Sequence, residues 1–151
     1  RDLSRSEEYF EFKIDQLKQC DDSVDLIVLP EYSDAPADVQ GKKGFYDAVD
    51  AYGEILLSKA VETAKRCHAL MFVNAGYKTE DGVRNTTHAI DRNGNIIGRY
   101  FKAHPAPSEV KTDAEGGHEL DVEYSGCACQ QDRSGNDLSY CSHDKCLLLY
   151  N

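Results

Sequence analysis

A short apolar run that ends at a proline and a carboxylate is the feature that most constrains this chain. Leu26 to Leu29 are four consecutive apolar residues, a pattern typical of a strand buried on both faces of a sheet. Pro30 cannot continue a central strand, so Glu31 is the first side chain beyond it. Ligands of open α/β sheets collect outside the carboxyl ends of the strands. Glu31 is therefore a candidate for chemistry, although a solvated loop residue is the commoner outcome for such a position taken alone.

The rest of the chain predicts an α/β fold in which a mixed sheet carries packed helices. Helical and strand-like patterns alternate at first, separated by a loop at Ser33–Gly44, and hairpins follow. The turn at Arg92–Asn95 contains Asn-Gly, which tolerates the positive φ of tight hairpins. The hairpins argue against a purely doubly wound fold. The segments expected to be regular are the helices Ser4–Gln19 and Phe45–Cys67 and the strands Leu26–Leu29, Leu70–Tyr77, Arg84–Asp91 and Ile96–Phe101.

Composition excludes several classes of function. A chain of 151 residues predicts one domain of ordinary size. The net charge of −10 argues against non-specific nucleic-acid binding, which needs a basic face. No apolar run approaches the ~20 residues that a membrane helix requires, and no signal segment opens the chain. Four of the six cysteines crowd the last 25 residues, and the rest of the chain can bury a core without disulfides, so a reduced, cytoplasmic setting is expected.

A second strand end carries a second candidate. The strand Ile96–Phe101 runs directly into Lys102, and His104, Pro105, Pro107 and Glu109 follow within seven residues. Prolines make this loop stiff. Leu-Ile-Val-Leu-Pro-Glu31, then the Asp91-Arg-Asn-Gly turn and Gly-Arg-Tyr-Phe-Lys102-Ala-His, resemble the motifs of the carbon–nitrogen hydrolase (nitrilase/amidase) family in their order. The resemblance extends to Ser125.

The resemblance implies a fold, an activity and three site residues. The fold would be the α-β-β-α sandwich of the nitrilase type, here incomplete. The activity would be hydrolysis of a non-peptide carbon–nitrogen bond in a small amide, carbamoyl compound or nitrile, through a cysteine thioester and without a cofactor. Glu31 would be the general base, Lys102 the oxyanion group and Glu109 a supporting acid. The small-molecule substrate would be the partner, and the intact family domain would form homo-oligomers.

The resemblance stops before the cysteine that the family uses as nucleophile. Residues 126–151 contain no apolar strand followed by Cys-Tyr-Asp, so no nucleophile is assigned. The chain is accordingly divided into 1–125, the N-terminal part of a carbon–nitrogen hydrolase domain, and 126–151, a cysteine-rich tail. The tail could be a zinc site, a divergent insertion or the product of a changed reading frame, the last being favoured by the abrupt loss of pattern. We expect family sequence to precede Arg1 and to follow Asn151. An inactive fragment or pseudoenzyme that keeps only a binding scaffold is the alternative function.

Overall fold

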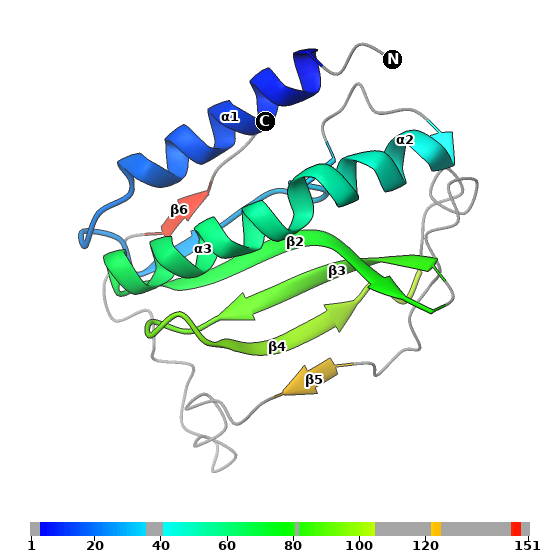
Figure 1. Ribbon diagram of the computed structural model, residues 1–151. Coiled ribbons are helices and arrows are strands. Elements are labelled where there is room, and N and C mark those ends of the chain that lie inside the picture. Colours follow the sequence, from blue (N-terminus) through cyan, green and yellow to red (C-terminus); the bar gives the residue numbers. More distant parts are fainter. Residues whose placement is uncertain (1–3, 36–40, 81, 105–121, 125–145, 149–151) are drawn as a thin grey trace.

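The structure, a computed structural model, describes residues 4–35, 41–80, 82–104, 122–124 and 146–148. They form a mixed sheet of six strands in the order β5-β4-β3-β2-β1-β6. The three strands β6, β1 and β2 run parallel, whereas β2 to β5 form antiparallel neighbours. Figure 1 shows the helices lying over the β1–β2 side of this sheet. The α/β fold with a mixed sheet that the sequence predicts is confirmed. The strands are β1 (Leu26–Val28), β2 (Leu70–Thr79), β3 (Gly82–Ile90), β4 (Ile96–Phe101), β5 (Val122–Tyr124) and β6 (Cys146–Leu148).

The first helix has the bounds predicted from the sequence, whereas the second predicted helix begins earlier and is interrupted. Helix α1 (Ser4–Gln19) has the predicted bounds. The second predicted helix begins four residues early, at Gly41, so the expectation that the loop continues to Gly44 is wrong. It is also interrupted, because α2 (Gly41–Ala48) passes through a π-helical turn at Val49–Gly53 before α3 (Glu54–Cys67). His68 ends α3 in the left-handed conformation, and its N–H closes onto the carbonyl of Ala64.

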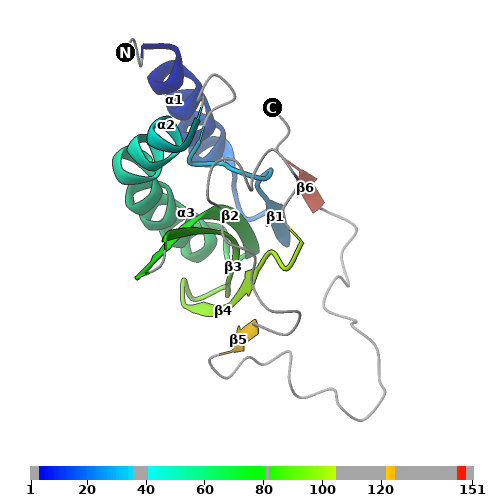
Figure 2. The same ribbon diagram turned by 90° about the vertical axis from the view of Figure 1, so that its right-hand side faces the viewer.

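The main core lies between α1, α3 and one face of the sheet. Ile27 of β1, Met71 of β2 and Leu56 of α3 are completely buried in it. Figure 2 shows the three helices on the same side of the strands. Leu26 and Val28, which alternate with Ile27, are only half-buried. The prediction that this strand is buried on both faces is therefore wrong, since only the face under the helices is closed within the described residues.

The π turn at Val49–Gly53 packs closely against β2 of the sheet. A Cβ atom on Gly76 would stand 2.6 Å from Cγ2 of Val49 and 2.9 Å from Cγ1 of Val83. Only glycine at this position of β2 lets the π turn lie on the strand. The same stretch of β2 is bonded to the loop that follows β1, since the N–H of Ser33 donates to the carbonyl of Asn74 at 3.0 Å. No helix within the described ranges has the length and apolar character needed to cross a membrane.

Candidate functional site

The structure brings Glu31 and Lys102 together although 71 positions separate them in the chain. The Nζ atom of Lys102 lies 2.7 Å from Oε1 of Glu31 and donates a hydrogen bond to it. Glu31 follows β1 and Lys102 follows β4, as the sequence predicts. The two strands are not neighbours, since β2 and β3 stand between them. The side chains therefore meet across two intervening strands, with Glu31 52% and Lys102 29% exposed.

Asn85 of β3 contacts both members of this pair. Its side-chain Nδ2 donates a hydrogen bond of 2.7 Å to Oε1 of Glu31. Its backbone carbonyl accepts a hydrogen bond of 2.9 Å from the backbone N–H of Lys102, which extends the β3–β4 pairing by one residue beyond Phe101. Asn85 is 3% exposed. Asn85 thus bonds to the Glu31 carboxylate through its side chain and to the Lys102 backbone through its own carbonyl group.

A second asparagine connects this group to the loop after β1. Asn74 of β2 donates from Nδ2 to Oδ1 of Asn85 at 2.7 Å and to Oγ1 of Thr87 at 3.2 Å. Its Oδ1 accepts a hydrogen bond of 2.7 Å from the backbone N–H of Tyr32. Tyr32 adopts a positive φ of 54°, which is strained for a residue with a side chain. The Asn74 hydrogen bond helps to hold this conformation directly beside Glu31.

Two buried charged side chains, Asp34 and Lys13, lie at the other side of the same loop. Asp34 is fully buried and accepts a hydrogen bond of 2.7 Å at Oδ2 from the N–H of Gly76. Lys13 of α1, 5% exposed, donates to the carbonyl of Ser33 at 3.1 Å. Burial raises the pKa of Asp34 to about 6, although backbone hydrogen bonds and the charge of Lys13 oppose this change. Burial lowers the pKa of Lys13, and the charge of Asp34 offsets part of the effect.

His88 is a further buried titratable group near the sheet centre. It is 1% exposed, and among the described residues neither ring nitrogen has a hydrogen-bond partner. Its ring lies 6.2 Å from that of Tyr77, and Arg99 stacks over Tyr77. Burial, with a smaller contribution from the charge of Arg99, lowers the pKa of His88 to about 4. His88 is therefore neutral at physiological pH, and no hydrogen bond among the described residues joins its ring to Glu31 or Lys102.

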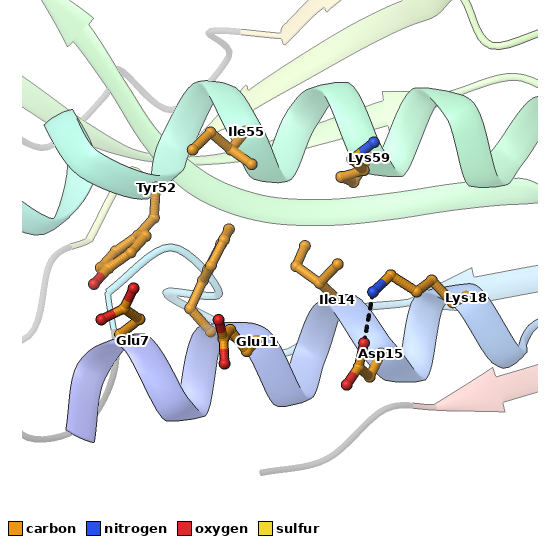
Figure 3. A pocket seen from close by; sticks show the side chains of 9 residues that line it. Glu7, Glu11, Ile14, Asp15, Lys18, Tyr52, Ile55 and Lys59 are labelled. Carbon is orange, nitrogen blue, oxygen red and sulfur yellow. Dashed lines mark hydrogen bonds and ion pairs between the residues drawn. The ribbon is translucent and has the colours of Figure 1, made fainter. Parts of the chain in front are cut away.

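A surface groove between α1 and α3 is separate from this pair. Figure 3 shows its lining side chains, which come from the two helices and from Tyr52 of the π turn. Its volume is about 550 Å³, and Phe10 stacks on Tyr52 in it with ring centroids 4.5 Å apart. Lys18 at its edge pairs with Asp15 of its own helix. Neither Glu31 nor Lys102 lines it.

The remaining predicted site residues are only partly described. Glu109 lies outside the described residues, so its supporting role stays a prediction. The cysteines of the proposed zinc site lie there too, apart from Cys146, whose backbone begins β6. Within the described part of the chain no three His, Cys, Asp or Glu side chains form a group that could hold a metal. Cys20 and Cys67 are thiols buried in the core, and burial raises the pKa of both.

The position of Cys146 is set by strand register. β6 pairs with β1 in parallel, with Cys146 opposite Leu26 and Leu148 opposite Val28. Cys146 therefore stands at the amino end of the strand pair, whereas Glu31 follows the carboxyl end of β1. Leu26 and Glu31 are five positions apart, on the order of 15 Å along an extended chain. The described structure does not bring Cys146 to Glu31.

Sequence comparisons find no relative, but the fold is found in solved enzymes. No protein-family model matches the sequence, and neither does any curated protein. Among solved structures, an N-terminal amidase is similar with a TM-score of 0.57 at 14% identity over 74% of this chain. A carbon–nitrogen hydrolase from Helicobacter pylori G27 gives 0.59 at 20% identity over 74%. The C. elegans NitFhit protein gives 0.54 at 21% identity over 77%.

These similarities concern a part of each larger protein. This chain covers 28% of the N-terminal amidase, 40% of the Helicobacter hydrolase and 30% of NitFhit. At such identities the similarity establishes the fold. The chain has part of the fold found in carbon–nitrogen hydrolases, as the sequence motifs predict.

Proposed function

We propose that this chain carries the Glu–Lys part of a carbon–nitrogen hydrolase site and acts on a non-peptide carbon–nitrogen bond in a small amide, carbamoyl compound or nitrile. The observation that carries the proposal is the 2.7 Å contact between Lys102 Nζ and Glu31 Oε1. The sequence motifs, the order of the strands and the similarity to solved carbon–nitrogen hydrolases all support it. The proposed setting is the cytoplasm, with a homo-oligomer as the assembled form.

Glu31 is the proton-transfer group of the proposed reaction. An amide carbon is a poor electrophile, so a cysteine thiolate first adds to it and makes a covalent intermediate. Glu31 takes the thiol proton and then gives it to the departing amine as the carbon–nitrogen bond breaks. The thioester that remains is attacked by water. Glu31 removes a proton from that water, the carbon–sulfur bond breaks, and the thiol recovers its proton.

Lys102 stabilises the negative charge that forms on the substrate oxygen. Addition of sulfur converts the carbonyl oxygen into an oxyanion, and a fixed ammonium group nearby lowers the energy of that state. The contact with Glu31 keeps the ammonium group beside the carboxylate that transfers the proton. Glu109 remains the proposed supporting acid.

The nucleophile lies outside the described part of the chain. Cys20 and Cys67 are buried in the core on the helix side, and register places Cys146 at the far end of β1. We therefore assign the reactive thiol to none of these three. Of the four late cysteines, Cys127, Cys129 and Cys141 remain open, and the proposal does not place them.

The test is release of ammonia or amine from a panel of primary amides, carbamoyl compounds and nitriles by the full 151-residue chain. The proposal predicts turnover that iodoacetamide abolishes and that a Cys→Ser substitution removes at one of the late cysteines other than Cys146. Cys20→Ser and Cys67→Ser serve as controls that retain turnover. An intact, folded chain that hydrolyses no member of the panel would contradict the proposal and favour a binding scaffold.

A further inference from the structure

A ring of hydrogen bonds starts at the backbone N–H of Tyr32 and ends at the side chain of the preceding residue, Glu31. It fixes the direction of both side-chain amides within it. The backbone N–H of Tyr32 donates to Oδ1 of Asn74, so Nδ2 of Asn74 must face Asn85. Oδ1 of Asn85 accepts that bond, so its Nδ2 faces Glu31. Each amide has one acceptor oxygen and one donor nitrogen, and reversing either one would place like groups against each other. The ring therefore presents an N–H donor to Glu31.

Both described hydrogen bonds to the Glu31 carboxylate end on the same oxygen. Asn85 Nδ2 and Lys102 Nζ each lie 2.7 Å from Oε1. No bond from a described residue to Oε2 accompanies them. Two donors converging on one oxygen hold that oxygen in place and leave the other oxygen to meet the reacting proton. Hydrogen bonds to a charged acceptor are short and strong, which suits this orienting role.

We infer that Asn85 is a positioning residue that holds Glu31 and Lys102 in one arrangement, with Oε1 as the anchored oxygen and Oε2 as the oxygen that transfers the proton. Its side chain orients the carboxylate, and its carbonyl fixes the backbone of Lys102 at 2.9 Å. Asn74 fixes the direction of the Asn85 side-chain amide by donating a hydrogen bond to its Oδ1. This inference rests on the proposed function for its catalytic consequence, but its geometry can be measured without any hydrolysis.

The first experiment reads the geometry by NMR on the full chain labelled with ¹⁵N. The side-chain amide signals of Asn85 are expected to move in Glu31→Gln, because the charged acceptor of its Nδ2–H has been removed. Glu62→Gln, at an exposed pair with Lys59, is the matched control and leaves those signals in place. Asn85 side-chain amide signals that do not move in Glu31→Gln would overturn the inference. This result stands even if the panel of substrates shows no turnover, so failure of the proposed function is distinguished from failure of the inference.

The second experiment measures kinetics in Asn85→Ala with the best substrate of the panel. We expect kcat to fall about 10- to 100-fold with KM changed less than about threefold, and Asn85→Asp, which exchanges the donor for a carboxylate, to fare no better. Asn95→Ala is the matched control, because Asn95 also donates to a carboxylate, that of Asp91 at 3.0 Å, in the adjacent hairpin turn. In Glu31→Gln the further substitution Asn85→Ala should add little, since the two act on one step. Equal losses in Asn85→Ala and Asn95→Ala, or full additivity with Glu31→Gln, would refute the positioning role.

Discussion

Replacing Asp34 by asparagine should change how the stability of this protein depends on pH. Asp34 is fully buried, and its pKa of about 6 compares with 3.8 for the ordinary group. The folded carboxyl group therefore holds its proton more tightly than the unfolded one. Its contribution to stability is complete below pH 3.8 and is lost as pH rises through 6. At 1.36 kcal/mol for each pH unit, the loss amounts to about 3 kcal/mol.

The assay is urea unfolding followed by far-UV circular dichroism at several pH values between 3.5 and 7.5. Asparagine keeps an oxygen that can accept the Gly76 N–H, but it cannot ionise. The difference in unfolding free energy between Asp34→Asn and the wild type should shift by about 3 kcal/mol in favour of asparagine across this range. His88 changes in the opposite direction, because its lowered pKa of about 4 makes it destabilising as pH falls. That contribution is common to both proteins and cancels in the difference.

Lys13 provides an internal check. Lys13→Met removes the positive charge that lowers the Asp34 pKa, so the loss of stability with rising pH should become larger than in the wild type. A difference between wild type and Asp34→Asn that stays constant from pH 3.5 to 7.5 would show that folding does not raise the pKa of Asp34. So would a difference that favours aspartate as pH rises, since the attraction of the Lys13 charge would then outweigh the burial of the carboxylate.

Three further predictions follow from packing and burial. Gly76→Ala should lower the unfolding free energy by about 1–3 kcal/mol in urea melts, because its Cβ would overlap Val49 at 2.6 Å. Gly53→Ala, with a helical φ of −58° and its nearest atom at 3.4 Å, is the control and should change it by less than about 1 kcal/mol. Cys20 and Cys67 should not react with iodoacetamide at pH 7 in the folded chain but should react in urea, as measured by peptide mass mapping. If they reacted in the folded chain as fast as a free small-molecule thiol, this would contradict their burial. The ring protons of His88 should titrate near pH 4 by NMR, and a midpoint near 6.5 would show that the ring is solvated.

The sequence identifies the two strand ends because each has a local signal. Pro30 stops one strand just before Glu31, and the Asn93-Gly94 turn fixes the hairpin that delivers Lys102. Gly94 indeed adopts a positive φ of 83°. Long periodic segments such as Ser4–Gln19 are equally well specified. These signals reside within a few neighbouring residues, so they can be recognised without tertiary information.

The parts that sequence reasoning missed depend on contacts between distant segments. Asn85 and Asn74 join the site through bonds to residues 54 and 42 positions away, which no local pattern reveals. Their one signal is that asparagine is depleted in strands, yet both stand inside strongly strand-like runs. The π turn at Val49–Gly53 was missed because the apolar stripe continues through it, and only the Gly53 in the stripe hinted at an irregularity.

A double-mutant cycle on amide hydrolysis would show whether Glu31 and Lys102 act together on a carbon–nitrogen bond. Ammonia release would be measured for the wild type, Glu31→Gln, Lys102→Met and the double variant. The exposed Lys59–Glu62 pair, whose charged atoms also lie 2.7 Å apart, supplies the matched cycle through Glu62→Gln and Lys59→Met. We predict a loss of at least about 100-fold in kcat for each site variant, little further loss in the double variant, and near wild-type rates in the control cycle. Site variants that hydrolyse the substrate as fast as the Lys59 and Glu62 variants would show that Glu31 and Lys102 have no catalytic role.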